Sequence, residues 1–183
     1  MIHHLKSDRL AWLLLLFGGL LWISATRVSD PNLLGSPGQR PPSPQVGFPA
    51  PNFALDDLSG QTVSSADLVG QPFVLNFWAT WCPPCRAEMP ALQTVGQAFD
   101  GRGVRVLAVN QAEGSDQVTA FMRSLGLSLP VLLDQDAAVS QLYRVRSLPT
   151  TFFVDREGVI REIVIGGPLS QALLTSKIES LLP

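Results

Sequence analysis

The 183-residue chain has very few side chains that bind metals through sulfur or imidazole nitrogen. It contains two cysteines, Cys82 and Cys85, and two histidines, His3 and His4, which lie far from them in the sequence. A structural zinc site takes four such ligands, so the two cysteines would need partners that the sequence does not supply nearby. We therefore expect no metal site and no cofactor other than a disulfide between the cysteines.

A basic composition is also absent. The chain carries 13 Lys and Arg residues against 15 Asp and Glu residues, a formal net charge of −2, and it has no long run of Lys or Arg. Binding to nucleic-acid phosphates needs a basic patch, so we exclude nucleic acid as a partner. The 46% share of hydrophobic residues is enough for one ordinary domain with additional segments.

Both cysteines belong to one Cys-Pro-Pro-Cys motif, which begins at Cys82. The apolar segment 73–78 before the motif is typical of a buried strand, and the residues after it predict a helix. Two thiols at this spacing and place are typical of a thiol–disulfide exchange centre, where one thiolate attacks a disulfide and the second resolves the mixed disulfide. A purely structural disulfide is the alternative, but so short a loop restricts the unfolded chain little.

The position of each cysteine predicts its role. Cys82 falls at the N-terminus of the predicted helix, where unpaired N–H groups and the helix dipole stabilise a thiolate, so we expect it to be the exposed nucleophile. Cys85 lies one turn further along and is expected to be the shielded, resolving thiol. Pro83 and Pro84 are tolerated in the first turn, where N–H groups have no partner within the helix, and they stiffen the loop.

The first 45 residues predict a membrane anchor and a linker. Residues 10–26 are uncharged and mostly apolar, and as a helix they would span about 25 Å, close to the ~30 Å of a bilayer core. Basic residues within 1–9 favour a cytoplasmic N-terminus. Residues 27–45 contain five prolines and predict an extended tether.

A cleaved signal peptide is the alternative for residues 10–26. No clear A-x-A motif follows this segment, which favours an uncleaved, signal-like anchor. In either case the domain that starts at residue 46 would lie outside the cytoplasm, and with an uncleaved anchor it would be held at the outer face of the cell membrane by a single span. An oxidising compartment of this kind suits disulfide chemistry.

Residues 46–183 predict one α/β domain. A leading hairpin is expected at 53–55 and 62–63, before the alternating elements. We expect further strands at 73–78, 104–109, 131–133, 151–154 and 159–164, and helices at 83–99, 116–125, 137–143 and 169–182. Strand–helix–strand units favour parallel pairs and the turn at 155–158 favours a hairpin, so the central sheet should be mixed.

The motif and its surroundings resemble the TlpA/ResA family of membrane-anchored, thioredoxin-like oxidoreductases. The resemblance lies in residues 77–90 (FWATWCPPCRAEMP), in residues 147–152 (SLPTTF) and in the order of anchor, linker and domain. It implies a thioredoxin-like fold with helices on both sides of the sheet, to which the N-terminal hairpin and an extra βα unit are added. It also implies a cis Pro149 opposite the cysteines and a substrate-binding face, formed by Trp81, Pro83, Pro84, Leu148, Pro149 and Thr150.

Two side chains bear on proton transfer. Thioredoxins proper have a buried aspartate in the strand before the motif, but the matching residue here is Asn76, which cannot take a proton. Glu88, three residues after Cys85, matches an acidic residue of ResA-like proteins, and we expect it to carry a proton or tune a thiol as a third catalytic residue. A solvated carboxylate on the helix surface is the alternative for Glu88.

The resemblance implies an extracytoplasmic enzyme that reduces protein disulfides. Apocytochrome c, whose cysteines must be reduced before haem attachment, is the leading substrate, and a membrane thiol transporter of the CcdA or DsbD type is the expected electron donor. The absence of a Glu directly after Pro149 separates the chain from the CcmG branch of the family. Direction of electron flow depends on the redox potential, which the sequence does not determine.

Three alternatives have less support in the sequence. A peroxiredoxin-like thiol peroxidase resembles Pro-x-x-x-Thr-x-x-Cys at its reactive cysteine, whereas this chain has Leu75 and Ala79 at the matching positions. A copper-delivery module of the same fold needs a histidine, and none follows His4. A non-catalytic interaction domain would leave the placement of the Cys-Pro-Pro-Cys motif unexplained.

Overall fold

The structure, a computed structural model, describes residues 40–182 of the chain. The predicted N-terminal segment (1–9), the predicted anchor (10–26) and the predicted linker up to residue 39 lie outside the described residues. Within residues 40–182, no helix is both long enough and apolar enough to cross a membrane. The anchor and the extracytoplasmic location therefore stay predictions.

A seven-stranded mixed sheet forms the centre of the described part, with the strand order β2-β1-β5-β4-β3-β6-β7. Strand β3 is parallel to β4, and β4 to β5, whereas the remaining neighbours pair in antiparallel fashion. The strands are β1 (Ala54–Asp57), β2 (Thr62–Ser64), β3 (Phe73–Trp78), β4 (Arg105–Gln111), β5 (Val131–Asp134), β6 (Thr150–Val154) and β7 (Ile160–Ile165). The mixed sheet, the leading hairpin and the second hairpin are thus confirmed.

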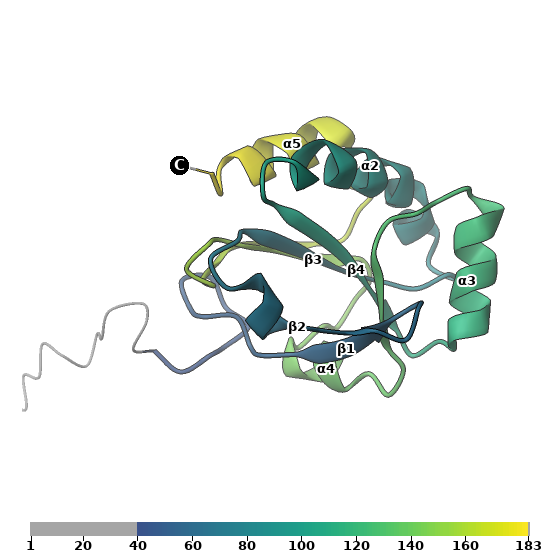
Figure 1. Cartoon of the computed structure of the whole chain (residues 1–183), viewed down its shortest axis with the longest axis horizontal. Helices are drawn as coiled ribbons and strands as arrows, with labels where there is room; N and C mark the ends of the chain where they lie inside the picture. Colours follow the sequence, from purple (N-terminus) through teal and green to yellow (C-terminus); the bar gives the residue numbers. More distant parts are fainter. Residues whose placement is uncertain (1–39, 183) are drawn as a thin grey trace, which may run out of the picture. The chain divides into compact units, whose positions relative to one another are not determined.

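Helices cover both faces of the sheet (Figure 1). One apolar cluster lies between the sheet and α2 (Pro83–Asp100), α3 (Ser115–Ser124) and α5 (Gln171–Glu179). A second cluster lies on the opposite face, where α4 (Ala138–Leu142) packs. The alternation of side chains along β3 explains the division, because Val74 and Trp78 belong to the first cluster and Leu75 and Phe77 to the second.

Strand β3 is the buried centre of the sheet. All six of its residues are buried, since β4 and β6 flank it and helices cover both faces. A strand in this position is typically a nearly continuous apolar run, interrupted here only by Asn76, which is why residues 73–78 could be recognised in the sequence. Helix α2 follows with buried residues at helical spacing, among them Met89, Leu92 and Val95, which seat it on the sheet.

Two elements differ from the prediction. The last helix was expected at 169–182, but α5 spans Gln171–Glu179. Ser170 caps its start, its side chain accepting a hydrogen bond from the Leu173 N–H (3.2 Å), and Ser180 is its C-cap. A short 3-10 helix, η3 (Ser65–Leu68), was not expected at all. The other boundaries agree to within two residues.

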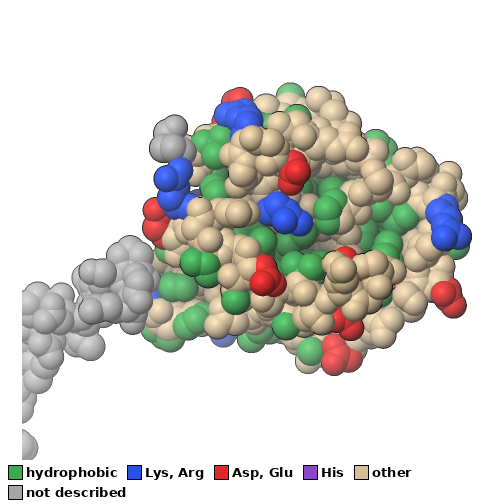
Figure 2. Space-filling model, viewed as in Figure 1, with side chains coloured by type: hydrophobic (Ala, Val, Ile, Leu, Met, Phe, Trp, Pro, Cys, Tyr) green, Lys and Arg blue, Asp and Glu red, His purple; other side chains and the backbone are tan. Residues whose placement is uncertain are grey.

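Charged side chains of both signs are scattered over the face seen in Figure 2, with apolar side chains exposed between them. No large basic patch is visible on this face of the described domain. That distribution matches the small net charge of the chain.

A buried tyrosine joins the segment before β1 to the second apolar cluster. Tyr143, at the end of α4, packs against the rings of Phe77 and Phe152, with ring centroids 5.3 and 5.0 Å away. Its hydroxyl donates a hydrogen bond to the Pro51 carbonyl (2.7 Å), and burial raises the pKa of this phenol far above its ordinary value of 10.0. The hydroxyl is thus a permanent donor.

Tyr143→Phe should lower the free energy of unfolding by about 1–3 kcal/mol, because the buried Pro51 carbonyl loses its donor while the aromatic packing stays. Urea unfolding of the two proteins measures the difference. Ser124→Ala, which removes an exposed hydroxyl bonded to the Phe121 carbonyl, is the control and should change stability by less than about 0.5 kcal/mol. Equal effects of the two substitutions would contradict this account of Tyr143.

Candidate active site

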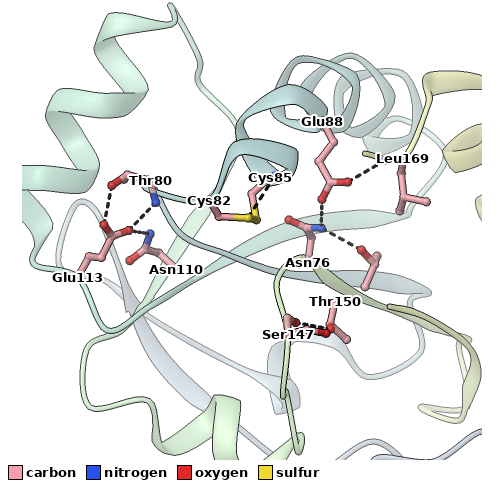
Figure 3. Close-up of a disulfide and its surroundings, with 11 residues drawn as sticks. Asn76, Thr80, Cys82, Cys85, Glu88, Asn110, Glu113, Ser147, Thr150 and Leu169 are labelled. Carbon is pink, nitrogen blue, oxygen red and sulfur yellow. Dashed lines mark hydrogen bonds between the residues drawn. A yellow bond between two sulfur atoms is a disulfide. The ribbon is translucent and has the colours of Figure 1, made fainter. Parts of the chain in front are cut away.

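The two cysteines lie where β3 ends and α2 begins (Figure 3). Cys82 is the N-cap residue of α2, and its sulfur accepts a hydrogen bond from the Cys85 N–H (3.3 Å). The two sulfurs form a disulfide, with 5.3 Å between the Cα atoms. An anionic sulfur at Cys82 would keep this backbone donor and gain from the helix dipole, which favours Cys82 as the thiolate.

The disulfide is more deeply buried than the sequence suggested. Cys85 is fully buried, as expected of a shielded thiol, but Cys82 is only 3% exposed, whereas we expected an exposed nucleophile. The reason is that both sulfurs lie in the apolar cluster beneath α2, with Trp78 and Met89. Trp81, directly before the motif, is instead 67% exposed, so an apolar ring lies at the surface next to the buried disulfide.

The loop before β6 contains Pro149 and lies at the same end of the sheet as the motif, since Thr150 pairs with Phe77 near the end of β3. The Leu148–Pro149 peptide bond is cis, and the Pro149 carbonyl accepts a hydrogen bond from the Gly166 N–H (2.8 Å). Leu148 is half-buried. Thr150 is buried and its hydroxyl donates to the Ser147 carbonyl (2.7 Å), so this hydroxyl is used within the loop itself.

A groove of about 240 Å³ runs beside the motif. Its walls are the exposed Trp81 on one side and the loop before β6 on the other, and its lining residues are Trp81, Gln111, Ala112, Val145, Arg146, Ser147 and Leu148. The groove therefore joins two of the predicted substrate-binding residues, Trp81 and Leu148. Pro83 is exposed and Pro84 half-buried, and neither lines this groove.

Glu88 is buried, which makes the solvated alternative wrong. Only 1% of the residue is exposed, and its carboxylate accepts hydrogen bonds from the Asn76 side-chain amide (2.8 Å) and the Leu169 N–H (2.8 Å). Burial raises the pKa of Glu88 above its ordinary value of 4.5, although both hydrogen bonds act in the opposite direction. Glu88 lies one turn after Cys85 on the same side of α2, so a titratable proton carrier faces the dithiol region.

The cover over Glu88 is a glycine. A Cβ atom at Gly167 would come within 2.6 Å of the Glu88 carboxylate and 2.8 Å of the Pro149 ring, so no larger residue fits without a shift. Gly167 is itself exposed. Only the backbone of Gly167 thus lies between this carboxylate and the surface, next to the cis Pro149.

A second buried carboxylate, Glu113, was missed by the sequence analysis. It accepts hydrogen bonds from the Thr80 N–H (2.7 Å), the Thr80 hydroxyl (2.5 Å) and the Asn110 amide (2.8 Å), and also from Gln117. These bonds attach the loop before Cys82 to the end of β4 (Figure 3). One signal was available: Asn110 lies near the end of β4 and Glu113 just after it, at the carboxyl ends where parallel strands place functional side chains.

Comparisons with known proteins agree with this geometry. The model of the AhpC/TSA family matches residues 46–163. Thiol-disulfide oxidoreductase ResA of Bacillus subtilis (strain 168) is 42% identical over 120 residues, 66% of this chain and 67% of that protein. The same-named protein of Geobacillus thermodenitrificans (strain NG80-2) is 37% identical over 138 residues, 75% of this chain and 79% of that protein. The chain belongs to the ResA-like oxidoreductases of this family.

The fold of this ResA-like oxidoreductase also matches solved structures. A putative thiol:disulfide interchange protein DsbE from Chlorobium tepidum superposes with a TM-score of 0.68 and 30% identity, covering 74% of this chain and 96% of that one. The resemblance inferred from residues 77–90 and 147–152 is therefore confirmed. The protein is a thioredoxin-like thiol–disulfide oxidoreductase. Disulfide exchange is therefore better supported than the peroxidase, copper-delivery and interaction alternatives.

Glu88 should make the stability of this ResA-like protein depend on pH. Because its folded-state pKa is raised, the folded state binds the proton more tightly than the unfolded chain, so stability is fully present below pH 4.5 and falls as pH rises through the folded-state pKa. Each unit of raised pKa corresponds to about 1.4 kcal/mol. Glu88→Gln should remove this fall.

Urea unfolding of the oxidised wild-type and Glu88→Gln proteins between about pH 4 and pH 8 measures the effect. Asp57 and Asp67, whose pKa values are lowered by hydrogen bonds, act with the opposite sign but equally in both proteins, so they cancel in the difference. A stability difference that does not change with pH would refute the raised pKa.

Proposed function

We propose that the protein reduces disulfides in other proteins outside the cytoplasm, with Cys82 as the nucleophile and Cys85 as the resolving thiol. The observation that carries this proposal is the placement of Cys82 at the N-cap of α2 with Cys85 fully buried behind it. Cys82 keeps a small exposed fraction (3%), whereas Cys85 has none, so a substrate would meet Cys82 first and Cys85 would react with a partner already bound to it.

The reaction has two exchange steps. The Cys82 thiolate attacks one sulfur of the substrate disulfide, forming a Cys82–substrate disulfide and releasing the other substrate sulfur as a thiolate, which takes a proton. Cys85 then loses its proton and attacks the Cys82 sulfur. The Cys82–Cys85 disulfide forms, the second substrate sulfur leaves and is protonated, and two electrons have passed to the substrate.

Glu88 is the proposed acceptor of the Cys85 proton. Its carboxylate is buried one turn along the same helix, and its raised pKa makes protonation favourable nearer to neutral pH than for a solvated carboxylate. Gly167 above it is exposed, which gives the proton a short way to solvent.

The groove beside the motif is the proposed site for the substrate segment. Trp81 supplies an exposed apolar wall, and Leu148 and the backbone beside the cis Pro149 supply the opposite wall. Pro83 extends the exposed surface on the motif side. Together with Pro84 and the Thr150 backbone they form the face on which an extended substrate segment would lie next to Cys82.

The proposed physiological role is reduction of apocytochrome c before haem attachment. The resemblance to the TlpA/ResA family supports it, as do the predicted anchor at residues 10–26 and linker at 27–45, which would hold the domain at the outer face of the membrane. A membrane thiol transporter of the CcdA or DsbD type would then supply electrons to the Cys82–Cys85 disulfide.

Trapping experiments test the assignment of the two cysteines. Cys85→Ser should accumulate stable mixed disulfides with substrate proteins, because Cys82 still attacks but nothing resolves the product. Cys82→Ser should trap few or none. Non-reducing electrophoresis with mass spectrometry of the captured chains measures both, and the reverse pattern would show that the roles are exchanged.

The redox potential tests the direction of electron flow. Equilibration of the Cys82–Cys85 pair with glutathione buffers should give a potential nearer to the roughly −270 mV of thioredoxin than to the roughly −120 mV of the oxidant DsbA. A strongly oxidising potential would exclude the reductase proposal while leaving disulfide exchange itself intact.

A further inference from the structure

Asn76 carries a buried acceptor that no protein group satisfies. Its residue is fully buried in the middle of β3, and among residues 40–182 no donor is bonded to its side-chain oxygen, Oδ1. A buried carbonyl oxygen without a partner costs about 1–3 kcal/mol, and such groups are rare in folded proteins. This oxygen therefore needs an explanation.

The orientation of the Asn76 amide follows from its neighbours. The amide nitrogen donates to the Glu88 carboxylate (2.8 Å) and to the Thr151 hydroxyl oxygen (2.9 Å). If nitrogen and oxygen were exchanged, the amide oxygen would face an ionised carboxylate, and neither group could donate. Glu88 and Thr151 thus direct Oδ1 away from themselves.

The oxygen is directed toward the disulfide, as Figure 3 shows. Asn76 lies on the α2 side of the sheet, between Val74 and Trp78 in the alternation of β3, and both cysteines belong to the apolar cluster on that side. Cys85 is fully buried there. The sulfurs thus lie on the side to which Oδ1 points. Among residues 40–182, Trp78 Nε1 is also a buried polar atom without a partner in this cluster, and it is not bonded to Oδ1.

We propose that Asn76 Oδ1 accepts a hydrogen bond from the Cys85 thiol when the dithiol is reduced. Reduction breaks the S–S bond and adds two electrons, and the proton that binds to the Cys85 sulfur creates a donor that the disulfide form lacks. The Cys82 sulfur already accepts a hydrogen bond from the Cys85 N–H (3.3 Å), whereas Asn76 Oδ1 is a buried acceptor that still has no donor within the described domain. This inference rests on the dithiol cycle proposed above.

The bond would give the two thiols different protonation states. An acceptor stabilises the S–H form of Cys85, while Cys82 has a backbone donor and the helix dipole, both of which stabilise a thiolate. Cys85 therefore stays protonated until Cys82 has formed a mixed disulfide. Its proton then passes to the Glu88 carboxylate, and the same Asn76 amide holds that carboxylate in place.

Infrared spectroscopy tests the proposed bond directly. The chain has two cysteines, so in Cys82→Ala the only S–H stretching band belongs to Cys85, and alanine cannot replace the acceptor. We expect a band shifted to lower frequency than that of a free thiol, ethanethiol in hexane being the reference. Adding Asn76→Leu, which has nearly the same shape, should move the band to the free-thiol frequency.

Thr151→Val is the matched control. It removes the other partner of the Asn76 nitrogen, is also buried, and leaves Oδ1 in place, so the band should stay shifted. A band that does not respond to Asn76→Leu, or that responds equally to Thr151→Val, would overturn the proposal. An S–H band at the free-thiol frequency in Cys82→Ala itself would also contradict the proposed hydrogen bond. This measurement does not depend on whether the Asn76→Leu variant folds.

This test is separate from the proposed function. The band reports the resting thiol, whatever disulfide the enzyme reduces and in whichever direction electrons flow. A shifted S–H band together with an oxidising potential would support the Asn76 hydrogen bond and exclude the proposed reductase function. A free-thiol band together with substrate trapping by Cys85→Ser would exclude the hydrogen bond and support the proposed function.

Discussion

The buried carboxylate of Glu88 is the interaction on which the arrangement of the site depends. It binds an amide from the central strand and a backbone N–H from the segment before the last helix, so it joins β3, α2 and the start of α5. Burying a carboxylate is costly, and these donors are what offset the cost. Gly167 adjoins both this carboxylate and the ring of the cis Pro149, so the buried acid and the cis-proline loop pack against the same residue.

A second carboxylate acts on the opposite side of the motif. Glu113 gathers donors from the loop before Cys82, from the end of β4 and from the first turns of α3. All of these partners are hydrogen-bond donors. An ionised carboxylate has two acceptor oxygens for them, whereas the amide of a glutamine would have only one. Two hydrogen-bonded carboxylates therefore flank the two cysteines: Glu88 one turn after Cys85, and Glu113 bonded to Thr80 just before Cys82.

Local patterns were sufficient for the fold and the chemistry. The apolar run 73–78, the Cys-Pro-Pro-Cys motif and the turn at 155–158 each act over a few residues, and the elements they predicted are present. The partners of Glu88 could not be found in this way, since Asn76 lies 12 and Leu169 81 positions away, and only the packing of α2 and α5 against the sheet brings them together. The burial of Cys82 likewise depends on packing between α2 and the sheet, which no local pattern reports.

The segment that leads into the domain is fastened at the end of the sheet that is remote from the dithiol. Gly47 and Phe48 bond to the backbone of Ile160, and Ala50 bonds to Gly158 in the turn between β6 and β7. That turn lies beside Phe73, at the opposite end of β3 from the motif. A mechanical load applied to the N-terminal end of the domain would therefore be borne by this hairpin, and the geometry around Cys82 would be insulated from the pull.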